Sequence, residues 1–244
     1  YTFQVAATNV VGTGGRSGAS LAVTPAALPG RPSAVTGTAG STTVDLTWSV
    51  PASDGGSAIT GYVVTPYIGA TAQSPLLFDA TTSHQVTGLA NGTTYTFTVA
   101  AVNGAGTGVA SDPSDPVTPS TVPDAPTSVS AVGGARQATV SWGAPASDGG
   151  SAVTGYDVFE YVDAVETYSI SYDATTREAV MPATDGIAHT FRVRAHNARG
   201  NGPLSDPTDA VTPTSTQGSP LNVTATAGDA QATVSWSAPS TDGG

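Results

Sequence analysis

The chain has 244 residues, of which 39% are hydrophobic, and it contains no cysteine. Its 7 basic residues are all arginines and stand against 18 acidic ones, for a formal net charge of −11. The lack of lysine excludes a Walker-type phosphate-binding lysine and a Schiff-base lysine, and the lack of cysteine excludes thiol nucleophiles, thiolate metal sites and disulfides. So acidic a chain should repel nucleic acids and anionic membranes. No apolar run reaches the roughly 18 residues of a membrane helix, so we expect no membrane insertion within this segment.

The sequence repeats itself with a period of 94 residues. Trp48, Trp142 and Trp236 keep this spacing, and the ten residues 53–62 recur almost unchanged at 147–156. Such self-similarity is the signature of tandem modules. In chain order we expect a C-terminal fragment of one module with its strands F and G, two full modules, and an N-terminal fragment of another with strands A and B. Their ranges are 1–25, 30–119, 120–213 and 219–244. We therefore expect the chain to be a segment of a longer array.

Within each module, apolar and polar residues alternate in short runs bounded by Gly, Pro, Asn and Asp. Residues 44–48, 62–64 and 95–101 of the first full module are such runs. Alternation with a period of two predicts strands with one buried face. About seven such runs without helical periodicity predict an all-β, immunoglobulin-like sandwich of two antiparallel sheets, with seven strands per module. A module of this size can bury a core without disulfides.

These residues resemble a family of known fold. The motifs that carry the resemblance in the first full module are Pro32-x-x-Val35, Val44-x-Leu46-x-Trp48-x-x-Pro51, Gly61-Tyr62-x-Val64, Leu89-x5-Tyr95-x-Phe97-x-Val99-x-Ala101-x-Asn103 and Gly106-x-Gly108. The second full module repeats Val140-Ser-Trp142-x-x-Pro145, Gly155-Tyr156-x-Val158 and Phe191-x-Val193-x-Ala195-x-Asn197. The chain thus resembles tandem fibronectin type III domains over essentially its whole length, most like those of bacterial secreted or surface proteins.

The resemblance implies structural roles for the large aromatic residues. The tryptophans would fill the space between the sheets, and Tyr95 would be a tyrosine-corner residue whose hydroxyl bonds to backbone a few residues upstream. In the second module His189 occupies that position and Ala183 stands where Leu89 does, so we expect a weaker or differently bonded corner there. The expected structural core comprises Trp48, Trp142, Trp236, Tyr62, Tyr156 and Tyr95.

One face of the second module combines aromatic and arginine residues. If Tyr156 and Val158 point inward, then the alternation turns Asp157, Phe159 and Tyr161 outward. The same reasoning turns Arg192, Arg194 and His196 outward on a neighbouring strand, with Asp157 near Arg194 or His196 and Phe159 near Arg192. A face of this kind suits sugars or protein partners, although we favour the simpler explanation, which is cross-strand pairing that shields an exposed sheet. The candidate interaction surface is Phe159, Tyr161, Tyr168, Tyr172, Arg192 and Arg194.

Signatures of catalysis and of cofactor or metal binding are missing. Three scattered histidines do not indicate a zinc site or a proton relay, and no Gly-x-Ser-x-Gly elbow is present. Clustered loop carboxylates could suit calcium, but Asp before Gly or Pro is ordinary turn chemistry, which we favour for Asp54, Asp148, Asp242, Asp112, Asp115, Asp206 and Asp209. We therefore expect no enzyme activity, no cofactor and no metal.

The sequence favours a non-catalytic extracellular or cell-surface array. Such an array would space neighbouring domains and contact proteins or polysaccharides, and the proline-rich linker 118–126 should be semi-rigid. Two alternatives stay open. The modules could be structural subunits of an extracellular filament or phage tail-type assembly, with self-assembly, or accessory linker modules of a secreted polysaccharide-degrading enzyme.

Overall fold

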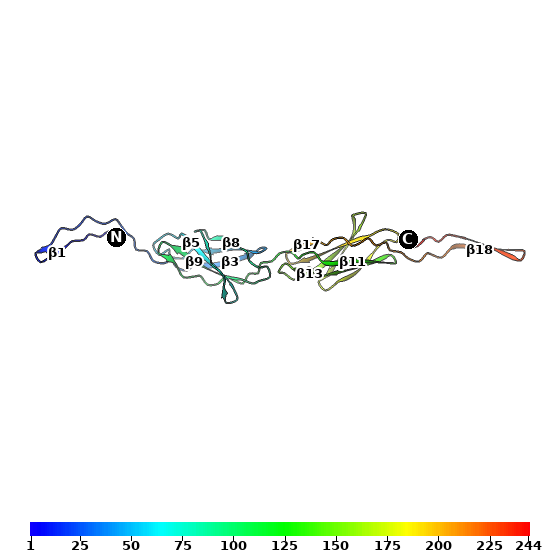
Figure 1. The fold of residues 1–244 in the computed structure, drawn as a ribbon, viewed down its shortest axis with the longest axis horizontal. Helices are drawn as coiled ribbons and strands as arrows, with labels where there is room; N and C mark the ends of the chain where they lie inside the picture. The colour runs from blue at the N-terminus through cyan, green and yellow to red at the C-terminus, as the bar shows by residue number, and fades with distance from the viewer. The chain divides into compact units, whose positions relative to one another are not determined.

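The computed structural model describes residues 1–244 and contains strands but no helix. The chain divides into two compact units, Tyr1–Pro119 and Ser120–Gly244, which are coloured from blue to green and from green to red in Figure 1. No helix is long and apolar enough to cross a membrane. The all-β prediction is confirmed.

The first unit contains one complete sandwich of two antiparallel sheets. One sheet has the order β3-β4-β8, and the other has the order β10-β9-β5-β6, with β7 also paired to β5. The strands are β3 (Ser33–Ala39), β4 (Thr43–Ser49), β5 (Gly61–Ile68), β6 (Thr71–Ala72), β7 (Leu76–Phe78), β8 (Ser83–Thr87), β9 (Thr96–Asn103) and β10 (Gly106–Thr107).

The second unit repeats this topology with longer strands. Its sheets have the orders β11-β12-β15 and β14-β13-β16-β17. The strands are β11 (Thr127–Gly134), β12 (Gln137–Gly143), β13 (Val153–Val162), β14 (Val165–Asp173), β15 (Glu178–Pro182), β16 (Thr190–Asn197) and β17 (Gly200–Leu204). These seven strands match the number expected for a module.

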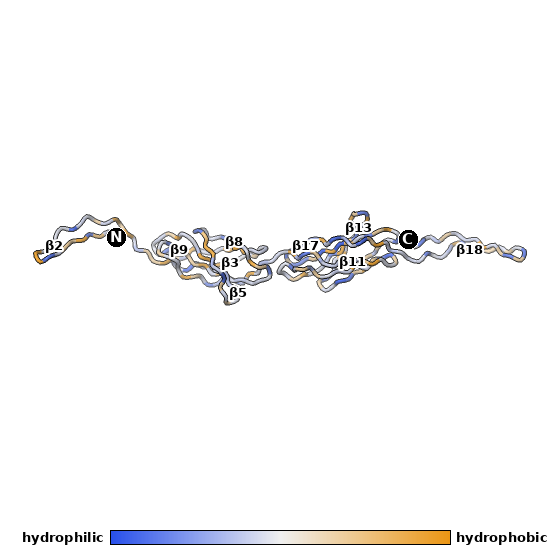
Figure 2. The backbone as a smooth tube through the Cα atoms, in the orientation of Figure 1, coloured by the Kyte–Doolittle hydropathy of each residue, from blue (hydrophilic) through white to orange (hydrophobic).

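Each sandwich has its own hydrophobic core, built by the inward half of each alternating strand. In β4 the residues Val44, Leu46 and Trp48 are buried while their neighbours are partly or fully exposed. Figure 2 colours the backbone by hydropathy, and hydrophobic stretches, in orange, occur in both units. The fully buried aromatic residues are Tyr62 and Phe97 in the first core and Tyr156 and Phe191 in the second. Trp48, Trp142 and Tyr95 are also buried, each less than a tenth exposed.

Two hairpins flank the sandwiches. In the first, β1 (Thr8–Asn9) pairs with β2 (Gly12–Thr13), and backbone bonds such as Gly14 N to Ala7 O match Gly108 N to Ala101 O, 94 residues later. The second hairpin pairs β18 (Leu221–Gly228) with β19 (Gln231–Ser237) in the register that β11 and β12 use. Each hairpin therefore keeps the strand pairing of the corresponding part of a complete module.

Trp236, the remaining tryptophan of the predicted core, lies outside both core clusters of the structure. Its side chain is 63% exposed, whereas its counterparts Trp48 and Trp142 are each 5% exposed. The hairpin of β18 and β19 is a two-stranded sheet, and no second sheet packs on it. The alternating pattern places Trp236 on the apolar side of the hairpin, but burial requires an opposing sheet.

The loop between the second and third strands of each sandwich is a turn clamped by a buried asparagine. In the second unit Asp148 Oδ1 accepts from the backbone N of Gly150 at 2.8 Å, and Gly149 has φ +74°. Asn197, only 6% exposed, donates from Nδ2 to the carbonyl oxygens of Thr121, Asp148 and Ser151. This asparagine ends the Ala-x-Asn motif, so the motif fixes the turn and the entry of the chain into the module.

Candidate interaction surface

The outer face of the sheet β14-β13-β16-β17 carries the aromatic and arginine residues singled out in the sequence. On β13, Asp157, Phe159 and Tyr161 are partly exposed, and Tyr156 and Val158 between them are fully buried. On β16, Arg192 and Arg194 are partly exposed, with Phe191 and Val193 buried. Alternation along the two strands thus sorts these side chains as expected.

The register between β13 and β16 brings the two sets together. Asp157 pairs with Arg194 and Phe159 pairs with Arg192. Each guanidinium, however, leans diagonally over the next ring on β13. The Cζ of Arg194 lies 5.0 Å from the ring centroid of Phe159, and the Cζ of Arg192 lies 5.9 Å from that of Tyr161. These are cation–π distances, so the face is a ladder of alternating rings and guanidinium groups.

Asp157 neutralises one of the two arginines. The Nη2 of Arg194 donates to Asp157 Oδ2 at 2.8 Å, and Ser171 Oγ donates to Oδ1 at 2.6 Å. Desolvation by burial raises the pKa of Asp157, but the hydrogen bonds from Ser171 and Arg194 outweigh it and hold the pKa below its ordinary value. Arg192 forms no ion pair, so its charge is the one this ladder leaves free for a partner.

The structure separates the six candidate residues into two groups. Phe159, Tyr161, Arg192 and Arg194 share the outer face. Tyr172 instead packs against the core, with its ring 6.1 Å from that of Trp142, and Tyr168 pairs with Glu160 on the inner side of the sheet. The expectation that Tyr168 and Tyr172 belong to the outer surface is therefore wrong, because their positions on β14 are in phase with the inward residues of β13.

The first module lacks this ladder. The positions of Phe159, Arg192 and Arg194 are occupied there by Thr65, Thr98 and Ala100. Tyr67 alone is retained, in register with Thr96. The aromatic and cationic surface is thus a property of the second module.

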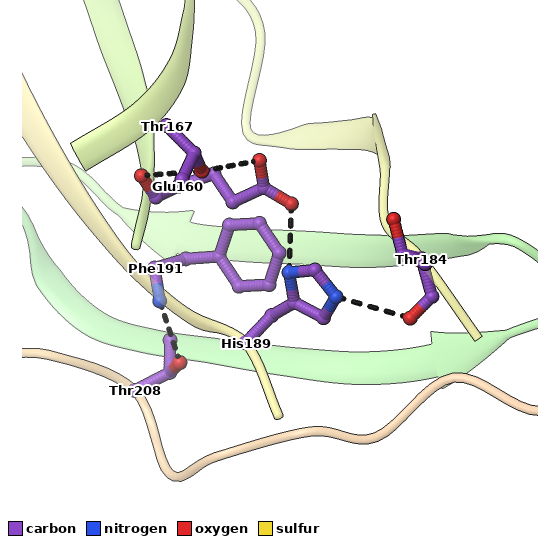
Figure 3. A network of polar contacts seen from close by, with 6 residues as sticks. All are labelled: Glu160, Thr167, Thr184, His189, Phe191 and Thr208. Carbon is purple, nitrogen blue, oxygen red and sulfur yellow. Dashed lines mark hydrogen bonds and ion pairs between the residues drawn. The ribbon is translucent and has the colours of Figure 1, made fainter. Parts of the chain in front are cut away.

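A buried histidine and a buried glutamate form the corner of the second module. His189 Nδ1 lies 2.8 Å from Glu160 Oε1, and the two side chains are 3% and 8% exposed. Figure 3 shows the imidazole between this carboxylate and the carbonyl oxygen of Thr184, which lies 3.1 Å from Nε2, while Thr167 Oγ1 donates to Glu160 Oε2 at 2.7 Å. The Nε2 of His189 donates to the carbonyl oxygen of Thr184, whereas Nδ1 faces the Glu160 carboxylate without forming a hydrogen bond.

The corresponding corner of the first module is built differently. Tyr95 Oη accepts from the backbone N of Ala90 at 3.1 Å, five residues upstream. Thr184 is the equivalent of Ala90 in the second module. His189 contacts the carbonyl oxygen of Thr184 rather than its backbone N. The prediction of a differently bonded corner is correct. The part that Glu160 takes in this corner was not predicted from the sequence. The alternation does indicate it, because Glu160 follows the inward-pointing Tyr156 and Val158 with the same spacing of two. The equivalent residue in the first module is Pro66.

No group of three or more His, Asp or Glu side chains is arranged to hold a metal ion. Asp112 forms an ion pair with the distant Arg31. Three other loop carboxylates are used locally: Asp54, Asp148 and Asp242 accept from the backbone N of the glycine two residues on. These bonds are those of turns, which is the interpretation that the sequence favours.

The geometry defines the class of protein first: tandem immunoglobulin-like β-sandwiches, each with its own hydrophobic core. The family model "Fibronectin type III domain" matches residues 30–118 and 124–211. The chain belongs to the fibronectin type III family.

Relatives come from animals and from a bacterium. The chain is 29% identical to chicken (Gallus gallus) fibronectin type-III domain-containing protein 3a, with 100% of the chain and 21% of the relative covered. It is 32% identical to human receptor-type tyrosine-protein phosphatase F, covering 84% of the chain and 11% of the relative. It is also 32% identical to Exoglucanase B of Cellulomonas fimi, covering 71% of the chain and 15% of the relative. The chain thus spans about a fifth or less of each of these proteins.

Proposed function

We propose that the chain is part of a non-catalytic spacer and adhesion array in an extracellular or cell-surface protein. The observation that carries the proposal is the succession of two complete sandwiches with separate cores and a very short connection. Pro119 O accepts from Gly92 N in the first unit, and Thr121 N donates to Gly149 O in the second, so Ser120 alone lies between these bonds. So short a connection suits modules that set a distance.

The contact function is assigned to the ladder defined by Phe159, Tyr161, Arg192 and Arg194. Aromatic residues and arginine are enriched where proteins bind partners. The partner class is a protein or a polysaccharide at a surface. The free guanidinium of Arg192, stacked on Tyr161, supplies a directional donor for a carboxylate or hydroxyl group of that partner.

The test compares the wild-type chain with the double variant Phe159→Ser, Tyr161→Ser in binding to cells or to surface polysaccharide. Adhesion of the purified chain to cells or to extracted surface polysaccharide should fall at least tenfold in the double variant. Tyr67→Ser in the first module is the matched control, because Tyr67 occupies the position of Tyr161 without the arginine ladder. Binding that is equal in all three proteins would reject the assigned surface.

A second candidate is supported by the relative Exoglucanase B. In that case the modules would be accessory parts of a secreted polysaccharide-degrading enzyme. Sedimentation of the chain with an insoluble glucan separates the candidates: retention on the glucan that is lost in the Phe159→Ser, Tyr161→Ser variant supports the accessory role.

A further inference from the structure

The edge strand β14 differs sharply from its counterpart in the first module. It is nine residues long, Val165–Asp173, and β13 is the only strand that pairs with it. In the first module the same edge is divided into β6 and β7, with two and three residues, and Pro75 lies between them at the position of Ser169. Short strands and prolines are the devices that keep sheet edges from pairing with other chains.

Nothing comparable protects the middle of β14. Its two charged residues, Glu166 and Asp173, lie near its ends. Tyr168 is 44% exposed and Val165 is 64% exposed, and the row of backbone N–H and C=O groups away from β13 has no strand partner. An edge of this kind is a template for one more strand.

The sequence in the middle of β14 is symmetric about Ile170. Residues 168–172 read Tyr-Ser-Ile-Ser-Tyr, the same in both directions. An antiparallel copy centred on Ile170 therefore places Tyr168 opposite Tyr172 and Ser169 opposite Ser171. Aromatic pairs and hydroxyl pairs are favourable across neighbouring strands. Glu166 falls opposite Ala174 in this register, so no two carboxylates face each other.

From these observations we propose that β14 is a homodimerisation edge, which pairs antiparallel with β14 of a second copy of this chain about a two-fold axis at Ile170. The product is a continuous eight-stranded sheet made from two four-stranded ones. An interface of this symmetry is closed, because each copy uses its β14 edge once and the two-fold axis relates the two edges. This self-association does not depend on the ligand-binding role proposed for the outer face.

The chain contains no cysteine, so cross-linking tests the register directly. Chains carrying Ser169→Cys are mixed with chains carrying Ser171→Cys under mild oxidation. Directly opposed residues lie within the Cα separation that a disulfide spans, whereas diagonal neighbours lie farther apart. The mixture should give a covalent dimer of twice 24.0 kDa at least fivefold faster than either variant alone.

Two matched variants complete the experiment. Leu77→Cys, at the position of Ser171 on the divided edge of the first module, should not cross-link with Ser169→Cys. Ser169→Pro copies Pro75 and should abolish dimers in sedimentation velocity, with unchanged Trp142 fluorescence as evidence of folding. Added salt should strengthen the wild-type dimer, because the two copies each carry −11. Any of three results would overturn the proposal. The mixture could cross-link no more than the Leu77→Cys control, either variant alone could cross-link as fast as the mixture, or the dimer could survive Ser169→Pro.

Discussion

Two positions place a polar pair in the interior of the second module. Where the first module has Pro66 and Tyr95, the second has Glu160 and His189, and these two residues meet at 2.8 Å inside the protein. The exchange is coupled, because a buried histidine or glutamate alone leaves a polar or charged group without its partner. The neighbouring change from Leu89 to Ala183 gives the corner more room, and a groove lined by Ala183, Tyr168 and His189 opens beside it.

Glu160→Ala should destabilise the second module strongly. Removing the Glu160 carboxylate leaves the buried Nδ1 of His189 without its nearest polar neighbour, and an unsatisfied buried polar group typically costs about 1–3 kcal/mol. Urea denaturation followed through Trp142, in a background with Trp48→Phe and Trp236→Phe, measures this module alone. The double variant Glu160→Val, His189→Tyr should lose less than the sum of the two single variants, and strict additivity would contradict the coupling.

Acid should weaken the outer ladder through Asp157. Its pKa in the folded module is held below the ordinary value by Ser171 and Arg194, against the opposing effect of desolvation. Its contribution to stability is therefore fully present above the unfolded pKa near 3.8 and is lost as the pH falls through the folded pKa. Urea midpoints of the second module between pH 6 and pH 2.5 should fall more steeply in the wild type than in Asp157→Asn. Parallel curves would show that the pair adds nothing.

At the scale of elements, one asparagine per module connects three segments of chain. Asn197 joins the end of β16 to the entry segment at Thr121 and to the turn at Asp148. Asn103 does the same for Ala27 and Asp54 in the first module. The clamp explains why the turn sequence Ser-Asp-Gly-Gly-Ser and the Ala-x-Asn motif occur together in both copies.

Asn197→Ala should destabilise the second module by about 2–4 kcal/mol, because carbonyl oxygens held by the buried amide lose their donor. Thermal unfolding followed through Trp142 gives the size of the effect. Asn103→Ala is the matched variant in the first module, and it should shift only the transition followed through Trp48. A shift below about 0.5 kcal/mol in both would show that water replaces the amide at no cost.

At the scale of the whole molecule, the two cores contain no common residue. All members of the first lie between Val35 and Val117, and all members of the second lie between Val129 and Val211. Domains with separate cores unfold as separate cooperative units. Each module is therefore expected to unfold without changing the stability of the other.

Leu46→Ala should accordingly lower the stability of the first unit by about 2–5 kcal/mol, since Leu46 is fully buried. The second unit should keep its unfolding midpoint. Differential scanning calorimetry, with Trp48 and Trp142 fluorescence to assign the transitions, measures both. A shift of both transitions by similar amounts would show that the units unfold together.

The sequence by itself determined the repeat, the strands and the inward or outward direction of almost every side chain on them. A period of 94 residues and an alternation of two are local properties of the chain, and the pleat of a strand converts them directly into faces. This is why Asp157, Phe159, Arg192 and Arg194 lie where the pattern places them. The assignment of Tyr168 and Tyr172 to the outer face was wrong for a related reason. Which residues of β14 share a face with those of β13 depends on the register between the two strands, and neither strand's sequence alone determines that register.

Tertiary structure decided what those faces meet. Trp236 has the same local sequence as Trp142 but is exposed, because burial depends on an opposing sheet. The diagonal stacking of each arginine depends on the twist and register of β13 and β16. The meeting of Glu160 with His189 depends on the closure of the two sheets around one corner. Each of these is a contact between segments distant in the chain, and such contacts are fixed by packing rather than by any local preference.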